Sequence, residues 1–205
     1  MISSRSLRML ALGDSYTIGS GLPLEDSWPY QLISQLRQKD IKIADPVIIA
    51  QSGWTSLNLI EGLNANPPGG RFDLVCLQIG VNDQYENIEP VFYGENFRDL
   101  LDQCIRLARK GPEGVLVLSI PDWSVTPHAG EFDRHQVQEE LEEYNAINHR
   151  ITQSRGVKYI DVTGSSRFAE QHPELLAEDG LHPTWEMYWN WTGLIQPLAL
   201  SIFES

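Results

Sequence analysis

Short runs of apolar residues alternate with longer stretches in which apolar positions recur every three or four residues, along nearly the whole chain. A short continuous apolar run is typical of a strand buried on both faces, whereas the longer spacing is typical of a helix with one apolar face. The predicted strands are residues 8–13, 46–51, 72–80, 114–120 and 157–162. The predicted helices are residues 27–39, 55–63, 96–110, 136–154 and 184–203.

Strands and helices that alternate in this way form βαβ units, in which consecutive strands are parallel. We therefore expect an α/β fold, a three-layer α/β/α sandwich with a five-stranded parallel sheet and helices on both faces. Pro197 is expected to kink or divide the last helix. The chain has 205 residues, 41% of them hydrophobic, and neither repeats nor low-complexity stretches, so residues 1–205 are expected to form one domain.

Charge and composition narrow the possible partners. The formal net charge of −13 argues against nucleic acid and against adhesion to anionic membranes, because both depend on clustered lysine and arginine. The N-terminal segment has no long apolar run that would act as a signal peptide, and no later stretch is long and apolar enough for stable membrane insertion. We therefore expect a protein that is cytoplasmic or already processed. Cys76 lies in a predicted strand and Cys104 in a predicted helix, and both are expected to be buried free thiols.

A glycine-rich turn, residues 13–21 ("GDSYTIGSG"), follows the first predicted strand. A strand, a turn and a helix N-terminus together make a physical site for an anion. The spacing argues against a phosphate site, however, because the turn lacks both the G-x-G-x-x-G pattern and the G-x-x-x-x-G-K-[ST] pattern. The turn instead places Ser15 at the carboxyl end of a strand, where open α/β sheets bind their ligands. A serine there needs a base before it can act as a nucleophile.

Other polar segments are expected at the same edge of the sheet. They are "QSGW" at residues 51–54, "GVND" at residues 80–83 and "PDW" at residues 121–123, each at the carboxyl end of a predicted strand. The segment "EDGLHPT" at residues 178–184 places Asp179 three residues before His182. An acid that close can hold the imidazole in one tautomer while the free ring nitrogen faces Ser15. The sequence therefore predicts a Ser15–His182–Asp179 triad.

Four separated blocks together resemble the SGNH hydrolases, also called the GDSL esterases and lipases. They are "GDSYT", "SGW", "GVND" and "DGLHP", and they occur in the family's order. The resemblance implies a flavodoxin-like SGNH hydrolase fold with Ser15 as the nucleophile. It also implies an oxyanion hole in which the Gly53 backbone and the Asn82 side chain are donors. Stabilisation of an oxyanion by the Ser15 and Gly53 backbone N–H groups and the Asn82 amide needs neither a metal nor a cofactor.

The expected activity is hydrolysis of a small-molecule carboxylic ester by a serine esterase, through an acyl-enzyme. A carbohydrate O-acetyl esterase and a lysophospholipase or thioesterase are the alternatives within this class. Trp54 and Trp123 follow strand ends and are expected to wall the substrate pocket. Residues 84–94 and 121–133 are the loops in which we expect substrate selection.

Other interpretations of the same residues stay open at this point. Asp14 and Asp83 are expected to be structural, although carboxylates at strand ends also bind Mg²⁺ or form the acidic site of a phospho-accepting receiver-like domain. A catalytically inactive binding module is a further alternative. The remaining histidines are expected on the surface or in loops; they are His128, His135, His149 and His172. The tryptophans of the last predicted helix are expected to be packing residues; they are Trp185, Trp189 and Trp191.

Overall fold

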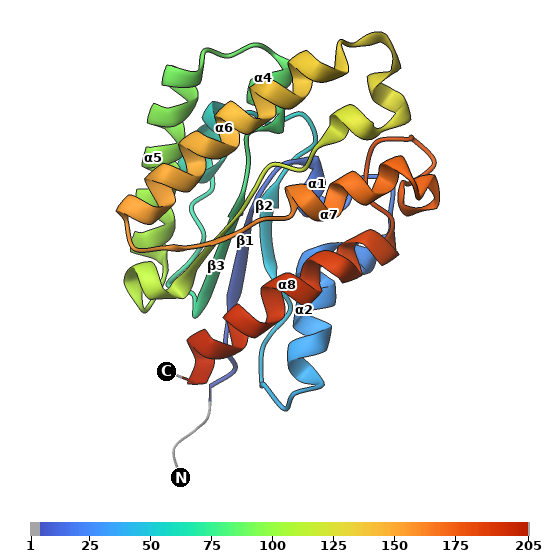
Figure 1. Ribbon diagram of the computed structural model, residues 1–205. Helices are drawn as coiled ribbons and strands as arrows, with labels where there is room; N and C mark the ends of the chain where they lie inside the picture. Colours follow the sequence, from blue (N-terminus) through green and yellow to red (C-terminus); the bar gives the residue numbers. More distant parts are fainter. Residues whose placement is uncertain (1–4, 205) are drawn as a thin grey trace.

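The computed structural model describes residues 5–204. Its centre is the predicted five-stranded parallel sheet (Figure 1), and the strands lie in the order β2-β1-β3-β4-β5. The ends of the predicted domain, residues 1–4 and 205, lie outside the described residues. The strands are β1 (Met9–Gly13), β2 (Val47–Ala50), β3 (Leu74–Gln78), β4 (Val115–Leu118) and β5 (Lys158–Ile160).

Helices cover both faces of the sheet. On one face α2 (Trp28–Arg37) packs against α8 (Trp185–Glu204), and on the other α5 (Pro90–Leu107) lies between α3 (Ser56–Ala65) and α6 (Arg134–Ser154) (Figure 1). The strands β1, β3 and β4 are buried throughout, as expected for strands covered on both sides. The structure confirms the predicted three-layer sandwich.

Shorter elements join these layers and carry part of the functional edge. They are the helices α1 (Ser15–Ile18), α4 (Val81–Tyr85) and α7 (Thr163–Ser166) and the 3₁₀ turns η1 (Leu24–Asp26), η2 (Gly111–Gly114), η3 (Trp123–Val125), η4 (Pro127–Glu131), η5 (Arg167–Glu170) and η6 (Pro173–Leu175). The segment 121–133, predicted to be irregular, therefore consists largely of the two turns η3 and η4.

Two helices differ from their predicted form. The helix predicted at residues 96–110 begins six residues earlier, at Pro90, because proline is well tolerated in the first helical turn. Part of the loop expected at residues 84–94 is therefore helical. The last helix, expected to be kinked or divided at Pro197, is not divided there, because α8 continues through this proline.

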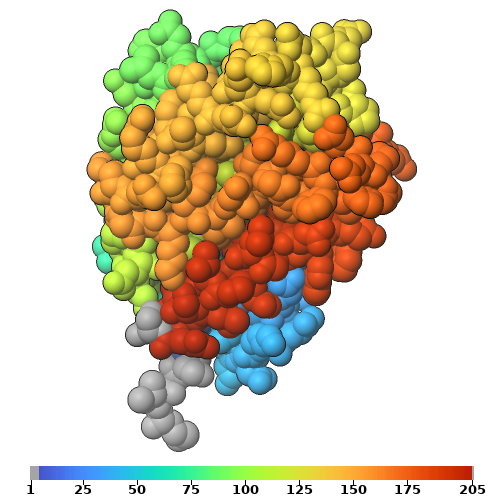
Figure 2. Space-filling view, in the orientation of Figure 1, coloured from blue at the N-terminus to red at the C-terminus, as the bar shows by residue number. Residues whose placement is uncertain are grey.

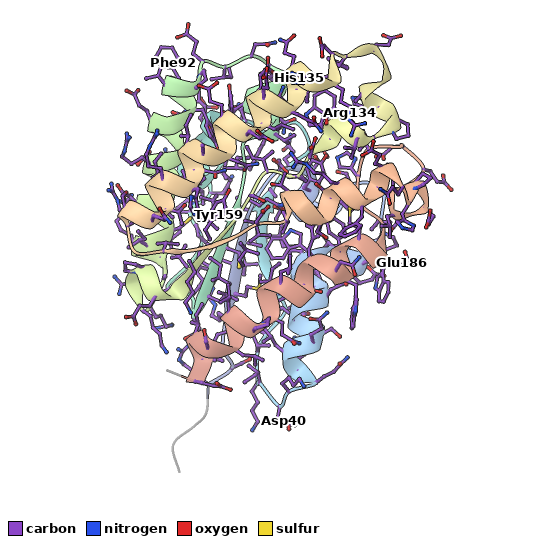
Figure 3. All side chains as sticks on the ribbon, in the orientation of Figure 1. Asp40, Phe92, Arg134, His135, Tyr159 and Glu186 are labelled. Carbon is purple, nitrogen blue, oxygen red and sulfur yellow. The ribbon has the colours of Figure 1, made fainter. Side chains whose placement is uncertain are left out.

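The core is one contiguous cluster of apolar side chains between the sheet and both helix layers. It includes both cysteines, which are buried free thiols as predicted. Side chains of α6, of α7 with the following turns and of α8 form a continuous surface over one face of the molecule (Figure 2). Polar side chains on the outer faces of these helices, such as His135 and Glu186, point into solvent (Figure 3).

Candidate active site

The sheet brings three of the predicted site segments together. The strand β1 pairs with β2 on one side and with β3 on the other, so the chain leaves these three strands in the same direction at the same edge. Such a point, where the strand order reverses, is where open parallel sheets form ligand crevices. Ser15, Gly53 and Asn82 follow β1, β2 and β3, respectively.

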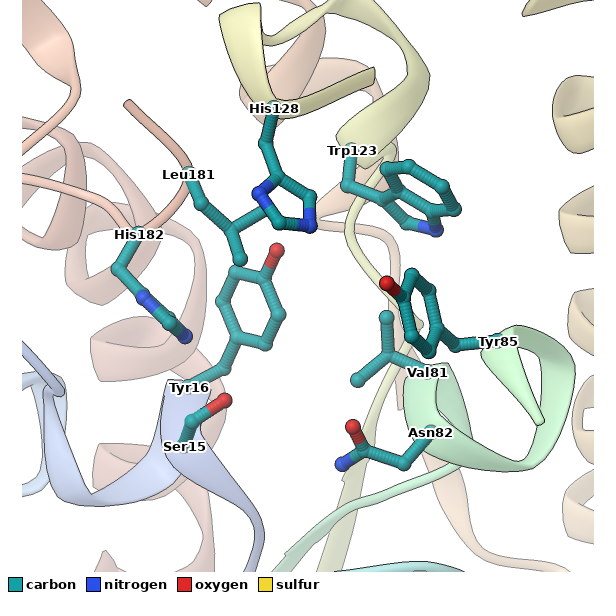
Figure 4. Close-up of a pocket in the computed structure, with 9 residues that line it drawn as sticks. All are labelled: Ser15, Tyr16, Val81, Asn82, Tyr85, Trp123, His128, Leu181 and His182. Atoms are coloured by element: carbon teal, nitrogen blue, oxygen red, sulfur yellow. The ribbon is translucent and has the colours of Figure 1, made fainter. Parts of the chain in front are cut away.

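Ser15 is the first residue of the short helix α1. The preceding residue, Asp14, caps this helix, and its carboxylate accepts a hydrogen bond from the backbone N–H of Tyr16 at 3.0 Å. The helix ends at Gly19, which adopts the left-handed conformation. This tight turn leaves Ser15 only 6% exposed, with its side chain directed into a pocket (Figure 4).

Asp179 and His182 form the pair that the sequence predicts. Asp179 Oδ2 lies 2.6 Å from His182 Nδ1, and Asp179 Oδ1 accepts hydrogen bonds from the backbone N–H groups of Leu181 and His182, both at 2.9 Å. Partial burial alone would raise the pKa of Asp179, but the hydrogen bonds from the His182 ring and from the two N–H groups outweigh it and lower this pKa. Asp179 is therefore held as a carboxylate beside the imidazole.

A pocket of about 270 Å³ joins His182 to Ser15, and Asp179 is not among its lining residues. Ser15 and His182 both line it, on the side opposite Asn82 and Tyr85 (Figure 4). Within the described residues no hydrogen bond joins the Ser15 and His182 side chains. Such bonds are often long in free enzymes and tighten when substrate binds. The lining residues are Ser15, Tyr16, Val81, Asn82, Tyr85, Trp123, His128, Leu181 and His182.

The other two residues expected in the oxyanion hole are Asn82 and Gly53. Asn82 Nδ2 donates a hydrogen bond to the backbone oxygen of Trp54 at 2.8 Å, which fixes the direction of the amide and leaves it a second hydrogen. Gly53 has a φ of +81°, a conformation that favours glycine, and a Cβ at this position would meet no atom within 4 Å. Gly53 is exposed, but it is not among the residues that line the pocket.

Asp14 and Asp83 are buried beneath this site. Asp83 accepts hydrogen bonds from the backbone N–H and the hydroxyl of Ser56, so it ties α4 to the start of α3. Burial raises the pKa of both carboxyls; that of Asp14 reaches about 7 despite the Tyr16 N–H, and the neighbouring Asp83 contributes to the rise. Within residues 5–204 no group of three or more histidine, cysteine, aspartate or glutamate side chains is arranged to hold a metal ion.

The two tryptophans expected to wall the pocket occupy different places. Trp123 lines it, and its indole N–H donates to Gln84 at 2.9 Å. Trp54 is not among the lining residues; its ring lies over Gly62 of α3, where a Cβ would come within 2.5 Å of it. Trp54 contributes to the site through its backbone oxygen, which Asn82 contacts.

Sequence reasoning missed several residues of the pocket wall. Tyr85 lies one helical turn after Asn82 on α4, so recognition of that helix would have indicated it. His128 was expected at the surface; it is exposed, but it also lines the pocket, and no sequence signal marks it. The rings of Tyr85, Trp123, His128 and Phe132 form one cluster beside the pocket, with centroid distances of 5.0–6.3 Å.

The tryptophans of the last helix divide into two kinds. Trp191 is fully buried, as expected for a packing residue. Trp185 and Trp189 were also expected to pack, but they are 42% and 44% exposed and stack on each other, with ring centroids 5.3 Å apart. These two therefore pack against each other on the solvent side of α8 and not into the core.

Comparison with known proteins agrees with the fold. An arylesterase from Vibrio mimicus is 26% identical over 188 residues, which cover 88% of this chain and 82% of that protein. The crystal structure of TesA superposes with a TM-score of 0.74 at 19% identity, covering 95% of this chain and 99% of TesA. The acetylxylan esterase Axe2 from Geobacillus stearothermophilus gives a TM-score of 0.72 at 17% identity, covering 98% and 96% of the two chains.

The fold and the blocks at the edge of its sheet define a hydrolase of the SGNH, or GDSL, type. The model of the GDSL-like lipase/acylhydrolase family matches residues 11–189, and the chain belongs to this family. It is a carboxylic ester hydrolase. Within residues 5–204 no helix combines the length and the apolar character that crossing a bilayer requires.

Proposed function

We propose that this hydrolase cleaves its ester through an acyl-enzyme on Ser15. His182 takes the Ser15 proton during attack and returns it to the leaving alcohol, while Asp179 holds the imidazole in the required tautomer and stabilises its charged form. The observation that carries this proposal is the 2.6 Å contact between Asp179 Oδ2 and His182 Nδ1, together with the position of His182 in the same pocket as Ser15.

The oxyanion that forms during attack would be stabilised by three donors. They are the backbone N–H groups of Ser15 and Gly53 and the side-chain amide of Asn82. The fixed direction of the Asn82 amide supports this role, because a donor that is already oriented needs no rearrangement as the charge develops. The open space around Gly53 supports it too.

The pocket favours a compact ester. Its wall is mainly aromatic and aliphatic, and its volume of about 270 Å³ lies near the lower end of the range for small-molecule sites. This supports a short acyl group or a single ring and argues against the long chain of a lysophospholipid. The similarity to the Vibrio mimicus arylesterase supports the same assignment.

The other function classes lack comparable support. A receiver-like domain would need an exposed acceptor carboxylate after the third strand, but Asp83 is completely buried and bonded to Ser56. A catalytically inactive binding module would have no use for an oriented acid–imidazole pair beside a serine. A small ester remains the proposed partner.

A fluorophosphonate probe tests the nucleophile. We expect the wild-type protein to be labelled at Ser15 and to hydrolyse phenyl acetate, and Ser15→Ala to lose both labelling and turnover. Ser20→Ala is the matched control, because Ser20 lies on the same turn but is hydrogen-bonded to Ser52. Hydrolysis by Ser15→Ala near the wild-type rate would refute the assignment.

A further inference from the structure

The residue that follows the nucleophile, Tyr16, projects its hydroxyl into the substrate pocket. Its ring lies between those of His182 and Trp191, with centroid distances of 5.1 and 6.3 Å, and the whole residue is only 3% exposed. The hydroxyl is the part that reaches the pocket, on the side where His128 and Leu181 lie (Figure 4). The motif that names the family has leucine at this position, so tyrosine adds a polar group to the wall.

This hydroxyl has no hydrogen-bond partner among residues 5–204. Four other tyrosines each donate their hydroxyl to a protein oxygen; they are Tyr93, Tyr144, Tyr159 and Tyr188, which contact Ile79, Ile88, Asn148 and Tyr16, respectively. The hydroxyl opens onto the pocket, so water can pair with it while no ligand is bound. A ligand that fills the pocket displaces this water and must offer the hydroxyl a partner in its place.

The hydroxyl is available as a donor over the whole working range of pH. Burial, reinforced by the nearby carboxylates of Asp14 and Asp179, raises the pKa of Tyr16 well above its ordinary value. The phenol therefore keeps its proton. An acceptor oxygen on the ligand is the matching group.

A purely hydrocarbon ligand would suit this pocket poorly. It would displace water from the Tyr16 hydroxyl and offer no acceptor in return, and leaving a buried donor unsatisfied is costly. The opposite wall carries the rings of Trp123 and Tyr85: the N–H of Trp123 is already bonded to Gln84, and Tyr85, whose hydroxyl also points toward the pocket, packs against Trp123 at 5.6 Å (Figure 4). The two sides together suit a ring that carries an oxygen.

We propose that Tyr16 is a specificity-determining residue that donates a hydrogen bond to a hydroxyl on a ring-shaped part of the ester, while the ring lies against Trp123 and Tyr85. This selectivity rests on the ester hydrolysis proposed above. Two kinds of substrate share this chemistry, an O-acetylated pyranose and the acetate of a hydroxylated phenol.

Matched substrates separate the contribution of the hydroxyl from that of the ring. In the aryl arm, kcat/KM is measured for para-hydroxyphenyl acetate and for para-tolyl acetate, in which a methyl replaces the hydroxyl. In the saturated arm, a monoacetylated methyl xyloside is compared with cyclohexyl acetate. The quantity of interest in each arm is the ratio of kcat/KM for the hydroxylated ester to that for its apolar counterpart.

We expect Tyr16→Phe to lower this ratio by about threefold to tenfold in at least one arm, which is the effect of one neutral hydrogen bond. The arm that responds identifies the substrate. Phenylalanine keeps the ring between His182 and Trp191, so a melting temperature close to that of the wild type is expected. Tyr30→Phe, the same change on α2 outside the pocket, should leave both ratios unaltered. Unchanged ratios in both arms for Tyr16→Phe would overturn the proposal.

Binding of the product alcohols keeps this test separate from that of the nucleophile. Two pairs of alcohols are titrated calorimetrically into the wild type, Ser15→Ala and Tyr16→Phe. The aryl pair is hydroquinone and para-cresol, and the saturated pair is methyl xyloside and cyclohexanol. We expect Tyr16→Phe to lose the preference for the hydroxylated member, and Ser15→Ala to retain it. If Ser15→Ala still hydrolyses esters, the nucleophile assignment fails while this comparison still decides the role of Tyr16. Equal binding of both members by the wild type would overturn that role.

Discussion

The side-chain amide of Asn82 donates a hydrogen bond to the backbone oxygen of Trp54 across 2.8 Å. This contact connects the segments that follow β2 and β3, and it points the amide in one direction before any substrate arrives. One amide hydrogen is used for the contact, and the second is free for an oxyanion. Asn82 therefore holds two segments of the site together and, in the proposed mechanism, also donates to the oxyanion.

Asn82→Ala is expected to reduce turnover by about 10² to 10³, with KM changed much less, because the donated bond forms with charge that appears only in the transition state. Asn82→Asp should be worse, since a carboxylate has no proton to donate and would repel both the oxyanion and the Trp54 oxygen. Turnover and melting temperature of the two variants check this order. An aspartate variant more active than the alanine variant would show that Asn82 only holds the loop.

Asp179 has two tasks that two substitutions separate. Asp179→Asn retains an acceptor for the N–H groups of Leu181 and His182 but no longer fixes the required tautomer of His182, so a loss of about 10⁴ in kcat is expected with little change in melting temperature. Asp179→Ala also removes the acceptor and should lower the melting temperature as well.

A double variant tests whether Asp179 and Ser15 act as a unit. Adding Asp179→Asn to Ser15→Ala should cost almost no further activity, because the members of a catalytic unit fail together. Losses that multiply in the double variant would contradict the proposed triad. The residual rates of the single and double variants are measured with phenyl acetate.

Asp14 is expected to make the protein less stable as the pH rises. Its pKa is about 7 in the folded protein, against the ordinary aspartate value of 3.8 in the unfolded chain, so between these values the folded state keeps a proton that the unfolded chain has released. Stability from this group is fully present below about pH 4 and is lost as the pH rises through about 7. Asp14→Asn, which still accepts from the Tyr16 N–H, should flatten the fall in melting temperature over this range.

The control for this titration is Asp45→Asn, which changes an exposed carboxylate on the surface. It should leave the slope of melting temperature against pH as it is in the wild type. A wild-type slope in Asp14→Asn would mean that Asp14 is already ionised in the folded protein.

Gly13 is expected to tolerate no side chain. A Cβ there would lie 2.1 Å from the Thr17 hydroxyl oxygen and 2.3 Å from the backbone oxygen of Gln78. Gly13→Ala should therefore lower the free energy of unfolding by about 3 kcal/mol, since the backbone of β3 cannot give way without disturbing the sheet. Gly130→Ala, where a Cβ would meet nothing within 4 Å, is the matched control for the chemical denaturation experiment.

The sequence by itself determined the sheet, its helices and the positions of the site segments. Apolar runs such as that of β3 predict buried strands because burial on both faces requires apolar side chains at consecutive positions. The Asp179–His182 pair could be predicted for a similar reason, because two residues three positions apart in one turn can bring their side chains into contact. Signals of this kind are local, so they can be recognised without knowing how the rest of the chain folds.

Only the tertiary structure decided which rings form the pocket and which face solvent. Trp54 and Trp123 occupy comparable places after their strands, yet one lies over Gly62 and the other lines the pocket. His128 enters the wall because its backbone N–H donates to Gly180, more than fifty residues later in the chain. The unpaired hydroxyl of Tyr16 likewise depends on what surrounds it. Burial and pairing of a side chain are set by segments distant in sequence, and no local pattern encodes them.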